Sequence, residues 1–202
     1  ANPITVYTDS NMTVVANFGE YLVGNWAMNE GSGTTLIDSS TYGNIGTISG
    51  NPLWVSGMKG QALSFSSTSQ YVAVRDTPSL HITSAITLAA WIAPTQGGVQ
   101  QRIISKAVQG TSDGYELTLS SGGQIFFRVN HTKNGGVGWK VQSTTLYPTS
   151  GTSWVHAAGT YDGNTIRMYV NGVEEINWPG VAIAIGVNTD SLYMGRQKDG
   201  QY

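Results

Sequence analysis

Hydrophobic and polar residues alternate with a period of two along much of the chain, and almost no stretch has the spacing of an amphipathic helix. The alternating runs are rich in β-branched and aromatic residues, and Gly, Asn, Asp or Ser bounds each of them, which is the pattern of short antiparallel strands. We expect strands in six segments, namely 86–94, 115–121, 124–130, 154–163, 165–172 and 191–196. Short strands separated by turn residues in this way predict an all-β fold, a two-sheet antiparallel β-sandwich.

The same alternation predicts which side chains fill the space between the two sheets. Ile86, Leu88, Ala90 and Ile92 share one face of their segment, and each of the other strands has a similar apolar face. The opposite faces would present aromatic and hydrogen-bonding side chains at the outer surface: Trp91, Glu116, Arg128, Asn130, Arg167 and Tyr169. The alternative is that the charged members form surface ion pairs and Trp91 packs into a second small core. A single bulge would also invert any of these assignments.

The longest expected irregular region covers residues 131–151 and contains Trp139. We expect Trp139 to be exposed on a loop at the binding rim, because glycines precede it and disfavour a strand. The other possibility is that 138–144 forms one more strand with Trp139 half buried. Trp26 and Trp154 each begin an apolar alternation, and we assign both to the core.

The composition narrows the range of functions. The chain has 202 residues with 26 glycines, a net charge of -2 and only 11% charged residues. A protein that follows nucleic-acid phosphates would carry a basic excess, so nucleic acid is not an expected partner. No apolar run reaches the length of a membrane span. The absence of cysteine excludes thiol nucleophiles, disulfides and Cys-ligated metals.

Sequence signals for catalysis are missing. A hydrolase on such a sandwich is expected to carry paired carboxylates close together on one strand, as in E-x-D-x-x-E, and no such run occurs. The adjacent acids Glu174 and Glu175 follow an Asn-Gly turn, where two carboxylates mark a solvated hairpin end. His156 shares a strand face with Trp154 and Ala158 and is expected to be packed and hydrogen-bonded. A Ser-His-Asp set remains open, because its members need not be neighbours in sequence.

Several motifs in order resemble laminin-G-like, concanavalin A-like jelly-roll domains of bacterial secreted proteins. They include W-x-x-x-E-G-S-G at 26–33, D-S-S-x-x-G-N-x-G at 38–46, I-T-L-A-A-W-I-A-P at 86–94 and W-V-H-A-A-G-T-Y-D-G at 154–163. The resemblance assigns residues 20–202 to one such domain and implies a last strand, of the type G-x-I-D-E-V-R-I-Y, that this sequence lacks. Residues 1–19 resemble the closing strands of an internalin-B-type β-repeat, and we expect them to be the tail of an upstream module.

The resemblance also implies a structural calcium ion near the chain ends in many relatives. Here Glu30 and Asp38 are the candidate ligands, because they lie in loops rich in the oxygen ligands that Ca²⁺ prefers. The alternative for Asp38 is an Asx-turn without metal.

These observations predict a non-catalytic carbohydrate-binding or adhesion module of a larger secreted or cell-surface bacterial protein. A sugar stacks its C–H face on an aromatic ring, and its hydroxyls pair with carboxylate, guanidinium and amide groups, which are the types expected on the outer face. The expected partners are a polysaccharide or other glycan and the other modules of the parent chain. The alternatives are a polysaccharide hydrolase or lyase, and a protein-binding or spacer module.

Overall fold

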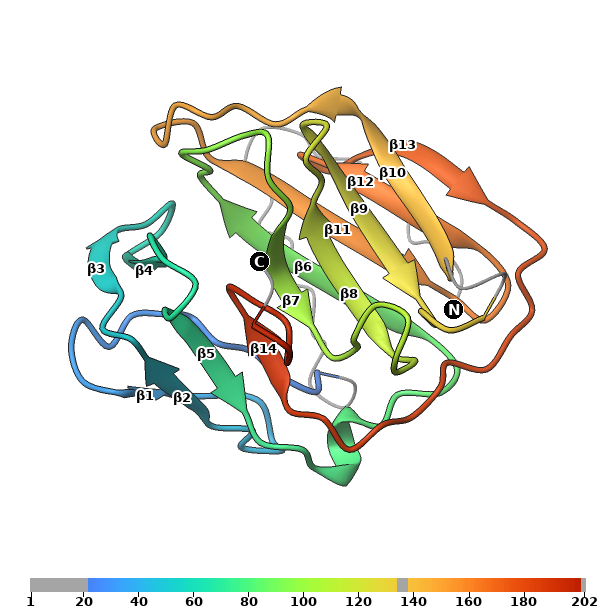
Figure 1. Cartoon of the computed structure of the whole chain (residues 1–202), viewed down its shortest axis with the longest axis horizontal. Coiled ribbons are helices and arrows are strands. Elements are labelled where there is room, and N and C mark those ends of the chain that lie inside the picture. Colours follow the sequence, from blue (N-terminus) through green and yellow to red (C-terminus); the bar gives the residue numbers. More distant parts are fainter. Residues whose placement is uncertain (1–21, 134–137, 201–202) are drawn as a thin grey trace, which may run out of the picture.

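Two antiparallel sheets stacked face to face form the body of the molecule, and a small hairpin lies at one end (Figure 1). The structure is a computed structural model that describes residues 22–133 and 138–200. The predicted all-β sandwich is confirmed, and within these ranges the helical content is a single 3-10 turn at Pro78–Leu80. None of the described helices is long and apolar enough to cross a membrane. The hairpin expected within residues 1–19 lies outside the described residues.

The larger sheet has eight strands in the order β1-β2-β5-β14-β7-β8-β9-β10. Their bounds are Thr35–Leu36 (β1), Gly46–Ser49 (β2), Tyr71–Val74 (β5), Leu192–Met194 (β14), Gln101–Ser105 (β7), Tyr115–Leu119 (β8), Gln124–Val129 (β9) and Trp139–Leu146 (β10). This sheet faces the viewer in Figure 1, with the smaller sheet behind it.

The smaller sheet has four strands in the order β13-β12-β11-β6. Their bounds are Val173–Trp178 (β13), Ile166–Val170 (β12), Val155–Tyr161 (β11) and Ile86–Ile92 (β6). The separate hairpin pairs Leu53–Ser56 (β3) with Gln61–Ser64 (β4). All these pairings are antiparallel, as expected for strands joined by short turns.

The interior between the sheets contains the residues that the alternation assigned to it. Ile125, Phe127 and Val129 of β9 are buried, as are Ile166 and Met168 of β12. All six predicted strand segments are present as β6, β8, β9, β11, β12 and β14. The prediction that residues 131–151 are irregular is wrong for the middle of this region. Strand β10 lies there and pairs with β9, with Trp139 opposite Val129.

Gly159 allows the two sheets to approach closely. It lies in the middle of β11, and a Cβ atom built at this position would be 2.2 Å from Cγ of Phe127. Phe127 is completely buried. Because any side chain at position 159 would occupy the volume of the Phe127 ring, this glycine sets the local spacing between the sheets.

Glu175 closes the edge of the larger sheet. β10 is an edge strand with a register shift between Gln142 and Leu146. Oε2 of Glu175, on β13, accepts hydrogen bonds from the backbone N–H groups of Thr144 at 2.7 Å and Thr145 at 2.9 Å. The carboxylate therefore joins the edges of the two sheets and satisfies donors that the bulge leaves without a strand partner.

We expect Gly159→Ala to lower the free energy of unfolding by about 1–3 kcal/mol, because the added methyl group overpacks the core against Phe127. Denaturant titration of both proteins would measure the difference. Gly97→Ala is the matched control, since a Cβ there meets only a Thr149 methyl group at 3.4 Å. Equal losses in the two variants would contradict the role given to Gly159.

Candidate functional site

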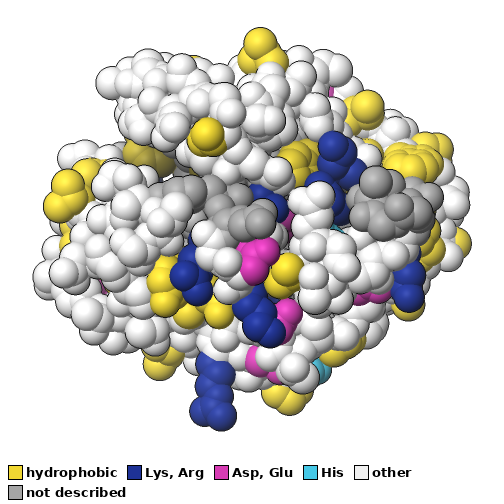
Figure 2. All heavy atoms as spheres, viewed as in Figure 1, with side chains coloured by type: hydrophobic (Ala, Val, Ile, Leu, Met, Phe, Trp, Pro, Cys, Tyr) yellow, Lys and Arg dark blue, Asp and Glu magenta, His cyan; other side chains and the backbone are white. Residues whose placement is uncertain are grey.

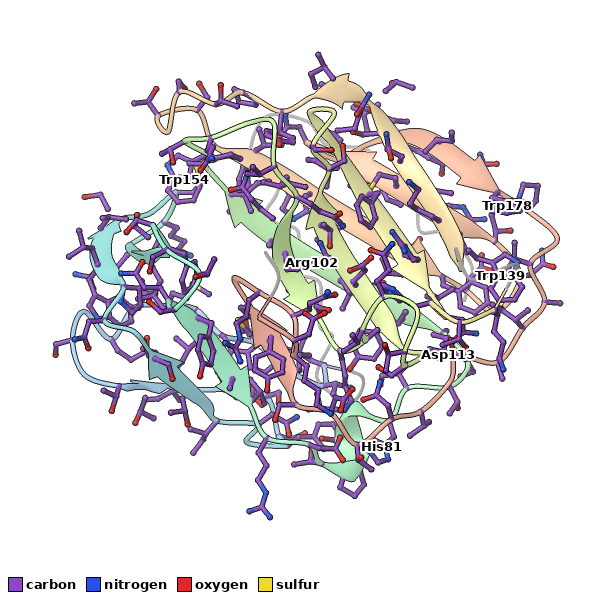
Figure 3. All side chains as sticks on the ribbon, in the orientation of Figure 1. His81, Arg102, Asp113, Trp139, Trp154 and Trp178 are labelled. Atoms are coloured by element: carbon purple, nitrogen blue, oxygen red, sulfur yellow. The ribbon has the colours of Figure 1, made fainter. Side chains whose placement is uncertain are left out.

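An aromatic cleft lies on the outer side of the four-stranded sheet, where β6 ends and β11 begins, near the β3–β4 hairpin. It has a volume of about 580 Å³, and we call it the Trp91 cleft. Its lining residues are Met58, Trp91, Trp154, His156, Asn171 and Gly172. In Figure 3, Trp154 lies on the side of the molecule where β3 and β4 are found, whereas Trp139 and Trp178 lie on the opposite side.

Strand alternation and register place the two central rings of this cleft. Ile92 and Ala90 of β6 face the core, so Trp91 between them points outward, and its side chain is 49% exposed. β11 pairs with β6 so that His156 is directly opposite Trp91. The two ring centroids are 5.1 Å apart with an interplanar angle of 59°. The outward orientation predicted for Trp91 is confirmed.

The turn between β12 and β13 supplies the polar wall of the cleft. Asn171 and Gly172 both have positive φ, 50° and 82°, as a tight Asn-Gly hairpin turn requires. Oδ1 of Asn171 accepts a hydrogen bond from the backbone N–H of His156 at 2.9 Å, and the N–H of Asn171 donates to the carbonyl of His156 at 2.8 Å. The Asn171 side chain is thus fixed, and its NH₂ group makes no hydrogen bond within the described ranges.

A second, smaller pocket of about 240 Å³ shares Trp154 and Asn171 with the Trp91 cleft. Its other walls come from the end of β10 and the loop that follows, including Tyr147 and Pro148, and from residues of β9, β11 and β12. Among the described residues, no Asp, Glu, Lys or Arg side chain lines either pocket. The combined surface offers indole faces, an imidazole and an amide, which suits an uncharged ligand with both C–H faces and hydroxyl groups.

Sequence reasoning missed most of this cleft. Trp154 was assigned to the core, but it precedes β11, is half buried and lines both pockets. His156 was expected to be packed, and it does contact Trp91, but on the outer face of its strand. A signal was present in the sequence, because Trp154 and His156 share a face, and Val155 and Ala157 form the buried face between them.

Arg167 and Tyr169 lie on the outer face of the same sheet, as predicted, but outside the cleft. Nη1 of Arg167 is 2.5 Å from Oδ2 of Asp162, and its Nε is 3.6 Å from Oε2 of Glu174. The hydroxyl of Tyr169 donates to the same Glu174 oxygen at 3.2 Å. The hydrogen bond from Arg167 is the main cause that lowers the pKa of Asp162 to about 2. Here the surface ion pairs considered as the alternative are present.

Glu116 and Arg128 were predicted on an exposed face, and this is wrong. Glu116 is fully buried, with its Oε2 3.1 Å from Nε of Arg102 and its Oε1 3.2 Å from Nε of Arg128. Both side chains are on the outer face of the eight-stranded sheet, but β8 is a central strand between β7 and β9, and other segments of the chain cover this part of the face. Gln197, itself buried, accepts a hydrogen bond from Nη2 of Arg102 at 3.1 Å and forms part of this cover.

Asn130 and Trp139 also differ from their predicted positions. Asn130 is buried at a φ of 56°, and its amide donates to the carbonyl of Ala184 at 2.8 Å and accepts from the N–H of Gly186 at 2.7 Å. It therefore anchors the segment before β14. Trp139 is half buried against the core at the start of β10. The expectation of an exposed loop tryptophan is wrong, and the alternative of a strand is confirmed.

The predicted calcium ligands suit a turn better than a metal. Asp38 is buried, and its two carboxylate oxygens accept four hydrogen bonds, from the N–H groups of Asn25, Ser40 and Asn44 and from the Ser40 hydroxyl. Burial opposes ionisation, but these hydrogen bonds lower the pKa of Asp38 below its ordinary value. Oε1 of Glu30 accepts from the N–H of Ile37 at 2.8 Å.

Because donors already surround the Asp38 carboxylate, these two residues do not fit a shared Ca²⁺ site. In the described part of the chain, no group of three or more acidic or histidine side chains is arranged to hold a metal ion. The calcium ion stays a prediction.

His131 adds a titratable group to the buried charges around Glu116. It is fully buried, and its Nε2 is 3.4 Å from Oε1 of Glu116. Burial is the largest cause that lowers the pKa of His131 to about 4, against the opposing effect of Glu116. The imidazole is therefore neutral at pH 7.

We expect His131→Gln to reduce the loss of stability on acidification. A histidine whose pKa is lower in the folded state than the usual 6.5 is protonated preferentially in the unfolded state, so stability falls as the pH decreases from about 6.5 to about 4. Denaturant midpoints measured across this interval would give the slope for each protein. An unchanged slope in the variant would mean that His131 does not titrate as described.

Comparisons with known proteins agree on the fold. Residues 66–202 match the family model of the concanavalin A-like lectin/glucanases superfamily. The binding domain of Paraclostridial Mosquitocidal Protein 1 superposes with a TM-score of 0.65 at 14% identity, covering 84% of this chain and 44% of that one. The botulinum neurotoxin serotype D ligand binding domain, solved with N-acetylneuraminic acid, superposes with a TM-score of 0.61 at 16% identity, covering 79% of this chain and 40% of that one.

A third similar structure is domain 4 of AbnA, an extracellular arabinanase from Geobacillus stearothermophilus, in complex with arabinotriose. It superposes with a TM-score of 0.55 at 16% identity, covering 77% of this chain and 75% of that one. The chain spans less than half the length of the two toxin domains. A search of curated protein sequences gave no significant match.

Proposed function

The chain belongs to the concanavalin A-like lectin/glucanases superfamily, and on that basis we propose that it is a non-catalytic carbohydrate-binding module. We assign the ligand to the Trp91 cleft. The module would belong to a larger secreted or cell-surface bacterial protein, which it would attach to a glycan.

One observation carries this proposal: Trp91 is 49% exposed in a cleft that also contains Trp154, His156 and the fixed amide of Asn171. A tryptophan gains stability from burial, so a half-exposed indole beside a second one marks a surface that a ligand can cover. The indole faces would stack on the C–H faces of sugar rings. The Asn171 NH₂ group and the His156 ring would pair with hydroxyls.

The lining of the cleft also favours a neutral sugar. In the described part of the chain, no Lys or Arg side chain lines the cleft or the adjoining pocket, so a carboxylate or sulfate group on the ligand would find no counter-ion among these residues. Hydrolysis requires two carboxylates beside the scissile bond, and none of the described residues that line the two pockets carries one, so we propose binding without hydrolysis.

The similar structures support a binding role by analogy of fold alone. One was solved with N-acetylneuraminic acid and another with arabinotriose, and a botulinum neurotoxin DC binding domain was solved with rat synaptotagmin II. Structures that contain this fold thus include complexes with sugars and with a protein, and this chain covers 40% and 42% of the two toxin domains. An open cleft with one or two stacking residues should bind weakly, at about micromolar to millimolar Kd, unless the parent chain repeats the module.

We expect Trp91→Ala and Trp154→Ala each to weaken binding of neutral oligosaccharides about tenfold, because each removes a stacking surface. A glycan array would identify the ligand, and isothermal titration calorimetry would measure its Kd. Trp178→Ala is the matched control, since Trp178 is 41% exposed on β13, far from Trp154 in the view of Figure 3.

Two results would contradict the proposal. Binding that is unchanged in both cleft variants would exclude this site. Cleavage of a polysaccharide by the purified chain alone would exclude the non-catalytic assignment.

A further inference from the structure

A second aromatic surface lies on the outer face of the eight-stranded sheet, on the opposite side of the molecule from Trp91. Tyr71 of β5 and Tyr193 of β14 point outward, since their strand neighbours Val72, Leu192 and Met194 are buried. β14 pairs with β5, and the two tyrosine rings meet edge to face with centroids 5.9 Å apart.

Arg196 lies over both rings. Its Cζ is 3.7 Å from the centroid of Tyr71 and 5.1 Å from that of Tyr193. The residues on either side are anchored, because the N–H of Gly195 donates to the carbonyl of Arg102 at 3.0 Å and the Gln197 side chain bonds Nη2 of Arg102 at 3.1 Å. Gly195 has a φ of 89°, which a side chain would disfavour. The guanidinium is therefore held in place before any ligand arrives.

The guanidinium of Arg196 has no acidic partner among the described residues. Arg102, Arg128 and Arg167 each pair with a carboxylate within 4.0 Å, whereas Arg196 forms no ion pair or hydrogen bond with residues 22–133 or 138–200. Of its three nitrogens, only Nε is sealed from solvent, without a hydrogen-bond partner. The two terminal nitrogens are left to water or to a ligand. We call Tyr71, Tyr193 and Arg196 the Arg196 platform.

Charges of both signs lie near the platform, and Oδ2 of Asp199 accepts a hydrogen bond from the Gln197 side chain at 3.1 Å. Arg102 and Arg128 both pair with Glu116, Asp199 also acts electrostatically on Arg102, and His131 beside them is neutral. Figure 2 shows Lys and Arg side chains near the middle of this face, with Asp and Glu side chains between them.

We propose that the Arg196 platform is a second binding site, specific for sugar residues that carry a carboxylate, such as hexuronates. A guanidinium with free terminal N–H groups can bind a carboxylate through two parallel hydrogen bonds, and the tyrosine faces can support the pyranose ring. The Trp91 cleft lacks charge, so the two faces of the sandwich would bind different classes of glycan. This site does not depend on the function assigned to the Trp91 cleft.

The test compares trigalacturonate with the neutral trisaccharide galactotriose, using isothermal titration calorimetry on the full chain. We expect Arg196→Gln to weaken trigalacturonate binding by about tenfold or more, since it removes a charge-assisted pair of hydrogen bonds. Added NaCl should weaken wild-type binding, because the site is partly exposed to solvent. Arg75→Gln, which changes the charge equally at an exposed arginine of the neighbouring loop, should leave binding unchanged.

Further variants separate this site from the cleft. Trp91→Ala should leave trigalacturonate binding intact, and Tyr71→Ala should weaken it, with thermal unfolding used to confirm that each variant is folded. Arg196→Lys keeps the charge but loses the planar fork, so we expect an intermediate loss.

Three results would overturn the proposal: no binding of trigalacturonate by the wild type, equal binding by Arg196→Gln, or loss of binding in Trp91→Ala. If neutral sugars did not bind the Trp91 cleft, the proposal for the Arg196 platform would be unaffected.

Discussion

The buried carboxylate of Glu116 is the interaction on which the larger sheet depends. It joins three adjacent strands, since Arg102 is on β7, Glu116 on β8 and Arg128 on β9, and Arg128 is its direct cross-strand partner. An ion pair of this kind need not add net stability, because both charges lose their hydration. Removing one member leaves the other buried without compensation, so only one register of these strands is compatible with the charges.

This arrangement makes the two outer faces of the sandwich different. On the outer face of the eight-stranded sheet, the charged side chains near the centre are buried. The Tyr71 ring and the Arg196 guanidinium form an aromatic and cationic surface on the same face. On the outer face of the four-stranded sheet, Arg167 of β12 forms ion pairs outside the Trp91 cleft. The cleft itself is lined by uncharged residues of β6, β11 and the turn after β12. A single fold thereby presents two chemically distinct surfaces on rigid strands, which hold their side chains more precisely than loops do.

The sequence was sufficient for the fold and for one side of each strand. Alternation in β6, β9 and β12 identifies the residues between the sheets, because burial there depends only on the pleat. It cannot show what covers the other side, so Glu116, Arg128 and Asn130 were placed in solvent although later segments of the chain cover or bind them. The cleft depends on pairings across long sequence distances, such as His156 opposite Trp91, and no local pattern specifies them. The prediction for Trp139 was wrong for another reason: the glycines before it suggested a loop, but Trp139 is the first residue of strand β10.

Glu175 has a consequence for the behaviour of the molecule at high concentration. Exposed strand edges recruit strands from other copies, and this is how sandwich proteins begin to form insoluble assemblies. At the bulge of β10, the Glu175 carboxylate takes the amide hydrogens of Thr144 and Thr145 that an incoming strand would need, and it places a negative charge in the path of that strand. The same contact that ties the two sheets together therefore also acts as a local guard against self-association.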